Sequence, residues 1–336
     1  MLSDVYTLLT NNYVEDDDNL FRFDYSREFL RWALCSPGWR AEWTIGVVDE
    51  RTGKMFAFIS AIPVEIRARA HTMKMAEVNF LCIHKKLRSR RLAPVLIKEI
   101  TRRVNLTGVW QAVYTSGTVI PKPVGSARYF HRLLNPKKLV QVQFTRLQRH
   151  DTMARFVKRH RLKEHPTTPH WREMVEGDVA DVARLLMSEL GKTQLAPTWT
   201  EEEVRHWLLP RAGVVYSYVV CPPSGEGVTD MISFYSLPST VLGNNIHPTL
   251  SAAFLFYAGG KMNRQELVED ALVVARDLGF DVFNALNIMD NEAFLGKLLF
   301  GAGDGSLHYY LYNWYVQGGT KETPPLAASD IGLLIL

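Results

Sequence analysis

The chain has 336 residues and a formal net charge of +4 at pH 7. Its composition, 47% hydrophobic and 22% charged, is that of a globular protein with one large or two ordinary domains. Three widely spaced cysteines argue against a disulfide framework and for a reducing compartment. The sequence has no run of about 18 apolar residues and no secretory signal pattern, so we expect a cytoplasmic protein without a membrane span.

The first part of the chain alternates helix-like and strand-like segments. The apolar patterns and the Gly, Pro and Asn positions predict a helix over 26–33, strands over 42–48, 54–63 and 75–83, a helix over 95–103 and a strand over 110–115. Residues 149–170 are rich in His, Arg, Lys, Thr and Pro and are typical of a connector.

The second part of the chain also alternates helix-like and strand-like segments. The patterns predict helices over 179–190, 201–208 and 266–278, and strands over 214–221, 231–237, 281–286, 308–314 and 331–336. Mixed sheets with helices on their faces, formed twice, are therefore the expected fold class.

A basic run joins the strand over 75–83 to the helix that follows it. Lys85, Lys86, Arg88, Arg90 and Arg91 surround the expected helix start, where backbone N–H groups lack partners and the helix dipole favours negative charge. The pattern indicates an anion site that suits a pyrophosphate. Nucleic acid is the alternative partner, but Glu99 interrupts the basic residues and no stacking platform accompanies them, so we expect no nucleic-acid binding.

Residues 77–94, EVNFLCIHKKLRSRRLAP, resemble the acyl-CoA-binding segment of N-myristoyltransferases (glycylpeptide N-tetradecanoyltransferases). The resemblance covers nearly the whole chain, and it also rests on NYVEDDD (12–18), FRFDY (21–25), FISAIP (58–63), QAVYT (111–115), PKPVG (121–125), YFHR (129–132), SFYSLPST (233–240), DVFNAL (281–286), GDG (303–305) and YYLYNW (309–314). It implies an α/β protein of two acetyltransferase-like (GNAT-like) halves, each a mixed twisted sheet flanked by helices, in a pseudo-twofold relation. Residues 1–148 would bind acyl-CoA, 149–170 would connect, and 171–336 would bind the peptide.

The resemblance implies transfer of myristate from myristoyl-CoA to the N-terminal glycine amine of peptides and nascent proteins. The protein would act as a monomer, by direct attack on the thioester, without a metal or a cofactor besides the co-substrate. The base would be the C-terminal carboxylate of Leu336; the sequence agrees, because 331–336 is apolar and a buried terminus is a better base. The backbone N–H groups of Phe80 and Leu81 would form an oxyanion hole at a strand bulge, and Asn79 and Thr115 would hold the amine.

The remaining site residues also come from the resemblance. The acyl-CoA site would comprise Phe80, Leu81, Cys82, Ile83, Arg88, Ser89, Arg90, Arg91, Leu92, Ala93 and Pro94. The peptide groove would comprise Val14, Asp16, Phe21, Arg22, Phe23, Tyr25, Tyr129, His131, Ser239, Phe254, Asn284 and Asp304. The acidic run 15–18 would favour substrates with lysine several positions after glycine.

Two alternatives stay open at this stage. Cys82 with His84 two residues away could form a covalent acyl-enzyme, if the two side chains share a strand face. The chain also starts where family members have already contributed an N-terminal segment that packs on acyl-CoA, and Phe254 stands where some members have a tyrosine. A catalytically silent protein that binds acyl-CoA and peptide is therefore the second hypothesis.

Overall fold

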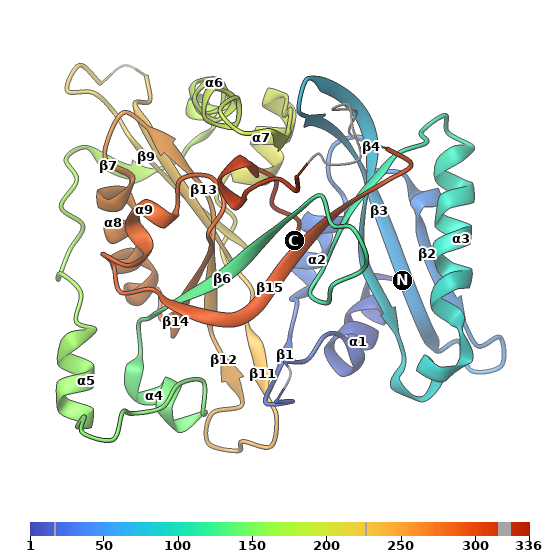
Figure 1. Cartoon of the computed structure of the whole chain (residues 1–336), viewed down its shortest axis with the longest axis horizontal. Helices are drawn as coiled ribbons and strands as arrows, with labels where there is room; N and C mark the ends of the chain where they lie inside the picture. Colours follow the sequence, from blue (N-terminus) through green and yellow to red (C-terminus); the bar gives the residue numbers. More distant parts are fainter. Residues whose placement is uncertain (17, 226, 315–323) are drawn as a thin grey trace.

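One twisted sheet runs through the whole molecule (Figure 1). The computed structural model describes residues 1–16, 18–225, 227–314 and 324–336. Within them a 12-stranded sheet has the order β2-β3-β4-β5-β15-β6-β14-β13-β10-β9-β7, with β8 paired to the C-terminal end of β3, and β1-β11-β12 form a second sheet.

The strands differ widely in length, and the longest ones lie in the first half of the chain. They are β1 Phe21–Phe23, β2 Thr44–Val48, β3 Met55–Ala68, β4 His71–Ile83, β5 Ala112–Ser116, β6 Gly125–Leu133, β7 Trp171–Glu173, β8 Leu195–Pro197, β9 Val215–Val220, β10 Asp230–Ser236, β11 Ser239–Val241, β12 Thr249–Leu250, β13 Ala252–Gly260, β14 Val282–Leu286 and β15 Gly301–Tyr312.

Several helices begin after a residue whose side chain accepts a hydrogen bond from a free N–H group, as Ser26, Thr200 and Asn263 do. They are α1 Leu2–Asn12, α2 Arg27–Leu34, α3 Leu92–Asn105, α4 Pro136–Gln141, α5 Met153–Arg159, α6 Val179–Leu190, α7 Glu201–Leu208, α8 Arg264–Asp277 and α9 Glu292–Leu295; short 3-10 turns cover Ala41–Trp43, Lys85–Arg90, Glu176–Asp178 and Ala328–Asp330.

Helices cover both faces of the sheet. Helix α3 packs on one face of the β2–β4 section through Leu96, Ile100 and Val104, while α1 and α2 contact the same strands through the main core cluster. Strand β13 shows the same arrangement in the other half, because Ala253 and Leu255 face the α8 core and Phe254 and Phe256 belong to the main core near α6. The expected mixed α/β fold is confirmed.

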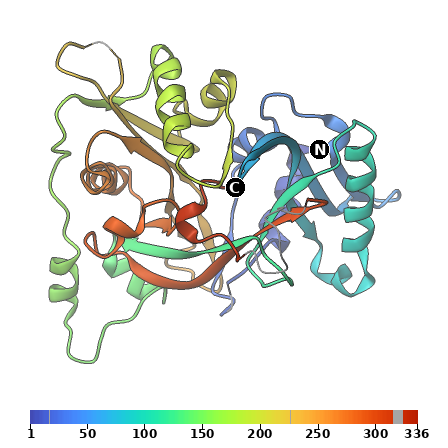
Figure 2. The ribbon, with the colours of Figure 1, turned by 45° about the horizontal axis from the view of Figure 1, so that its top comes forward.

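The two halves exchange strands at the middle of the molecule. Strand β15, from the end of the chain, pairs with β5 and β6, and β6 pairs with β14, so residues on both sides of 148 alternate in one ladder (Figure 2). The C-terminus lies in this central region (Figure 1). The domain boundaries at 148 and 171 stay predictions.

Most predicted elements are confirmed, with differences at the ends. Strands β6 and β13 were not predicted. The sequence of β6 mixes polar and apolar residues and that of β13 is a continuous apolar run, so neither shows the alternation typical of a half-buried strand. The predicted connector 149–170 contains helix α5. The prediction of a strand over 331–336 is wrong: this segment makes a single bridge, Leu195 with Ile331, and is otherwise irregular. Its side chains Ile331, Leu333 and Ile335 are buried, and Leu334 and Leu336 are half-buried.

Candidate active site

Strand β4 is interrupted by a bulge at Phe80 and Leu81. Phe58 pairs with Cys82 and Ser60 with Asn79, so two residues of β4 stand opposite one residue of β3. Phe80 has φ +57, a left-handed conformation that is strained for a residue with a Cβ. The bulge expected for an oxyanion hole is therefore present, and the strained backbone of Phe80 lies within it.

Asn79 connects the bulge to the end of the chain. Its Oδ1 accepts a hydrogen bond from the Phe80 N–H (2.8 Å), and its Nδ2 donates to the backbone oxygen of Leu336. One side chain thus contacts both the expected oxyanion donor and the residue that carries the terminal carboxylate. The buried side chains of Ile331, Leu333 and Ile335 hold the final segment in place.

Strands β4 and β5 separate beside this point. Their parallel ladder consists of Ala76 with Ala112 and Glu77 with Val113, and the described pairing ends there. The backbone of β4 from Val78 onward is consequently not paired with β5, which leaves room for a ligand to bind along it. Thr115 lies on β5 just beyond the separation and pairs with Tyr309 on its other side.

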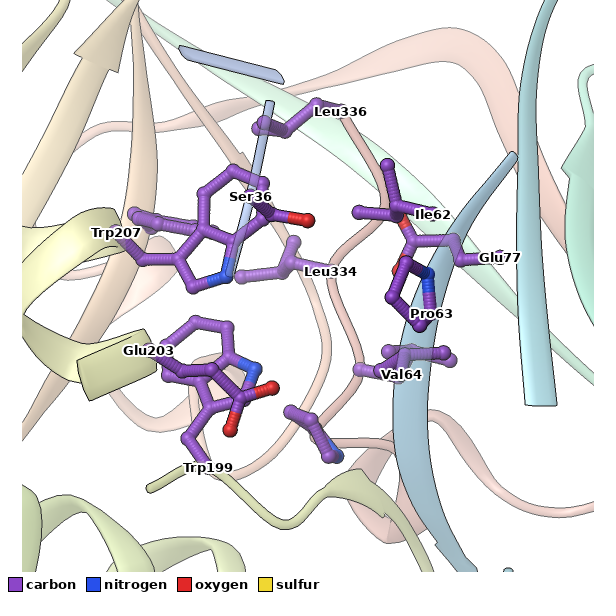
Figure 3. Close-up of a pocket in the computed structure, with 13 residues that line it drawn as sticks. Ser36, Ile62, Pro63, Val64, Glu77, Trp199, Glu203, Trp207, Leu334 and Leu336 are labelled. Atoms are coloured by element: carbon purple, nitrogen blue, oxygen red, sulfur yellow. The ribbon is translucent and has the colours of Figure 1, made fainter. Parts of the chain in front are cut away.

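Two small cavities meet next to Leu336. The inner one is lined by Ala33, Ser60, Ile62, Glu77, Asn79, Phe80, Trp207 and Leu336. The outer one lies between α7 and β3, where Glu203 and Trp207 face Ile62, Pro63 and Val64, with Leu336 at one end (Figure 3). The terminus therefore borders both cavities.

Glu77 is a site residue that the sequence reasoning missed. It lines both cavities, and burial raises the pKa of its carboxyl to about 8. The available signal was a single acidic residue in the middle of the apolar run 75–83, which is unusual because a charged side chain is rarely buried without a partner.

Cys82 does not have the environment of a nucleophile. Its side chain is buried, and burial raises the pKa of the thiol to about 12, so the thiolate is scarce at neutral pH. His84 lies beyond the end of β4, where its ring packs edge-on against Phe56 and its Nδ1 accepts from the Lys86 N–H. The covalent alternative loses its support.

The basic run forms a 3-10 turn that leads into α3. Arg91 adopts the left-handed conformation at the N-cap, and Arg90, Arg91 and Ser89 are exposed there. Arg88 donates to the backbone oxygen of Asn12 (2.5 Å), which ties the turn to α1. The N–H groups of Leu92 and Ala93 lie at the start of α3, a helix of 14 residues, so this region keeps the features of an anion site. Ile83 is the last residue of β4 before the turn, and Pro94 lies in the first turn of α3 after it.

A row of aromatic rings connects the bulge to the second half. Tyr25 packs edge-on against Phe80 (centroids 5.2 Å apart) and contacts Phe23, which in turn contacts Phe254. Tyr129 meets Phe254 at 6.3 Å. These predicted peptide-groove residues are brought together by β1, β6 and β13, and Ser239 lies opposite Phe23 in the β1–β11 ladder.

A polar group lies at the far end of this row. Nδ1 of His131 donates to Oδ1 of Asn284 (2.6 Å) across the β6–β14 ladder. Asp304 is close enough to oppose the lowering of the His131 pKa that burial causes. Phe21 reaches the same area, because its ring and that of His131 both pack against Phe144.

The acidic run near the N-terminus is partly used for local structure. Asp16 accepts hydrogen bonds from the N–H groups of Leu20 and Phe21, and Glu15 pairs with Arg22 and Lys85, which lowers the pKa of Glu15. Val14, Asp16 and Asp18 are exposed, and Asp17 lies outside the described residues. The preference for lysine in the substrate stays a prediction.

Neither a metal centre nor a membrane-spanning helix is found in the described part of the chain. No described group of three or more His, Cys, Asp or Glu side chains is arranged to hold a metal ion. Among the helices that the structure describes, none combines the length and the apolar character needed to cross a bilayer.

Comparisons with known proteins agree along the whole chain. Residues 1–127 match the family model described as the N-terminal domain of myristoyl-CoA:protein N-myristoyltransferase, and residues 141–334 match the model of its C-terminal domain. The chain is 52% identical to glycylpeptide N-tetradecanoyltransferase 1 of Arabidopsis thaliana, covering 100% of this chain and 76% of that protein. It is 51% identical to glycylpeptide N-tetradecanoyltransferase 2 of Danio rerio, covering 100% and 67%.

Solved structures give the same result. The Saccharomyces cerevisiae N-myristoyltransferase with bound myristoyl-CoA superimposes with a TM-score of 0.93 at 40% identity, covering 100% of this chain and 86% of that one. A GCN5-related N-acetyltransferase from Anabaena variabilis, at 11% identity and a TM-score of 0.52, covers 92% and 69% and shows the fold alone. The expected GNAT-like fold is confirmed, and the chain belongs to the myristoyl-CoA:protein N-myristoyltransferase family.

Proposed function

We propose that the protein transfers myristate from myristoyl-CoA to the N-terminal glycine amine of proteins. The observation that carries this proposal is the position of Asn79, which contacts the strained bulge on one side and the C-terminal residue on the other. Acyl transfer to an amine needs an oxyanion site and a base close to each other, and this side chain joins the two.

The groups have separate roles in the proposed reaction. The terminal carboxylate of Leu336 takes a proton from the glycine ammonium, whose pKa of roughly 7.7–8 makes a modest base sufficient at neutral pH. The free amine attacks the thioester carbon, the N–H groups of Phe80 and Leu81 stabilise the oxyanion, and the thiolate of coenzyme A leaves. Asn79 and Thr115 hold the amine. Asn79 must release the Phe80 N–H for this, since its Oδ1 accepts a hydrogen bond from that N–H.

The coenzyme and the peptide approach from different sides of the bulge. The 3-10 turn and the start of α3 bind the pyrophosphate, and the aromatic row with the His131–Asn284 pair forms the peptide groove. Selection for glycine follows from a channel too narrow for a Cβ beside the reacting amine. The acceptors are peptides and nascent proteins that begin with glycine after removal of methionine. We further propose that the protein works in the cytoplasm, as a monomer and without a metal.

The test is release of free coenzyme A from myristoyl-CoA with an octapeptide that begins with glycine. A matched octapeptide that begins with alanine is the control, and a parallel reaction with EDTA tests the metal-free mechanism. Glycine-dependent release that EDTA does not change is the expected result. Equilibrium binding of both substrates by the folded protein without release would overturn the proposal and favour the catalytically silent alternative.

A further inference from the structure

Glu77 is a buried acid without a partner. Its side chain is 8% exposed on β4, between β3 and β5, and no ion pair or hydrogen bond to it is formed by the described residues. Most buried charged groups are paired, because an unpaired one is costly to remove from water. A carboxyl group kept in this position needs an explanation beyond the packing of the sheet.

Glu77 forms part of the boundary between the two cavities beside the terminus. Only Ile62, Glu77, Trp207 and Leu336 are shared by the linings of both. The inner cavity, at Asn79 and Phe80, offers about 10 Å³ to the centres of water-sized molecules, and the outer one about 20 Å³. Since one water needs roughly 10–15 Å³, the inner cavity has space for one water and the outer cavity for one or two.

The outer cavity has polar groups that suit bound water. Ser36 lines it, and the Ser36 hydroxyl is buried with no hydrogen-bond partner among the described residues. Glu203, at the start of α7, also lines it and is only half-buried, so the cavity reaches the surface there. Buried polar groups in folded proteins are nearly always satisfied, and water bound between Ser36 and Glu77 satisfies both.

We propose that Glu77 is a proton-relay residue, which acts through Leu336 and passes the proton taken from the glycine amine through water in the outer cavity to solvent at Glu203. This inference rests on the proposed function. The terminal carboxyl gives its proton, by way of water, to one oxygen of Glu77, and Glu77 releases the proton it already carries on its other oxygen. The terminal carboxylate is ionised again, and the charge of Glu77 is the same before and after.

Burial raises the pKa of Glu77 and keeps its carboxyl protonated at rest. The charged and titratable groups nearby are the carboxylate of Glu203, the terminal carboxylate and the hydroxyl of Tyr257, and none of them is a cation. The Tyr257 hydroxyl donates to the backbone oxygen of Gly332, so it is already used in holding the final segment. A group with a pKa of about 8 exchanges protons readily near neutral pH, as a relay requires.

The test compares Glu77→Gln with Glu65→Gln. Glu65 is an exposed residue of the neighbouring strand β3 and lies outside both cavity linings. For each variant we would measure kcat, the KM of both substrates and the solvent deuterium isotope effect on kcat, from pH 6 to 9. The Glu77 variant is expected to lose about ten-fold in kcat, with both KM values within two-fold and a larger isotope effect, because proton removal becomes limiting. Glu77→Asp should restore most of the rate.

Several results would overturn the relay. An unchanged kcat in Glu77→Gln at every pH is one, and equal losses in the Gln and Asp variants with an unchanged isotope effect is another, since that pattern indicates a packing role. If Glu77→Gln does not fold, Ser36→Val fills the outer cavity and leaves Glu77 in place; a normal isotope effect in that variant also contradicts the relay. Absence of glycine-dependent release in the unmodified protein would instead refute the proposed function.

Discussion

The side-chain amide of Asn79 donates to the backbone oxygen of Leu336, the last residue of the chain. The two residues are 257 positions apart in the sequence, so the contact forms only when the final segment packs against β4. We expect Asn79→Ala to lower kcat about 10- to 100-fold, since it removes the contact to the base and one of the two groups proposed to hold the amine. Asn11→Ala, on the exposed face of α1, is the control; coenzyme A release by the two variants at equal rates would contradict this role.

Removal of Leu336 should nearly abolish turnover at pH 7.5. The truncated chain ends in a carboxylate at Ile335, which no longer lies at Asn79 or at the junction of the two cavities. Affinity for myristoyl-CoA should stay within a few-fold, because the basic turn and α3 are untouched. Calorimetric titration with the coenzyme and a rate measurement on the same sample check both parts, and full activity of the truncated chain would exclude the terminus as the base.

Cys82→Ala should keep measurable transfer. The raised pKa of the buried thiol leaves little thiolate, so the substitution removes a small core side chain rather than a nucleophile. A stability loss of about 1 kcal/mol and a rate within several-fold of the unmodified protein are expected. Complete loss of coenzyme A release by a folded Cys82→Ala protein would revive the acyl-enzyme mechanism.

The stability of Glu77→Gln relative to the unmodified protein should increase as the pH rises. In the folded chain the pKa of Glu77 is about 8, above its value in the unfolded chain, so folding takes up a proton between roughly pH 4.5 and pH 8. The unmodified protein therefore loses stability across this window, by up to about 3 kcal/mol at pH 7, and the Gln variant does not. Thermal unfolding at pH 5 and pH 8 measures this: the advantage of the variant in Tm should be larger at pH 8, and an equal Tm difference at both would show that the pKa is not raised.

Asp18→Asn is expected to reduce the preference for substrate peptides with lysine several positions after glycine. Asp18 is exposed and Asp16 also caps the turn through Leu20 and Phe21, so the Asp18 variant removes charge with less structural change. In the unmodified protein, peptides with lysine should be preferred about two- to five-fold. The preference should be stronger at low salt, because salt screens attraction between charges at the surface. Competition between lysine and glutamine peptides at two salt concentrations measures it, and an unchanged ratio in both the Asp18 and the Asp16→Asn proteins would rule out the acidic run as its source.

The sequence determined the elements whose signals are local. Helices α6 and α7 have the predicted bounds, because the apolar spacing and the Thr200 cap specify them without help from distant residues. The basic turn before α3 and the family of the chain could likewise be recognised from residues 77–94, where composition and order are both unusual.

The tertiary structure decided what lies between those elements. The final segment is apolar and therefore was predicted as a strand, yet it is held by side-chain burial and the contact with Asn79 rather than by a ladder. The separation of β4 from β5, the bulge of β4 against β3 at Phe80 and the buried carboxyl of Glu77 arise from contacts between segments far apart in the sequence. Sequence periodicity reports which face of an element is buried, but the partner that covers that face is chosen only when distant segments pack together.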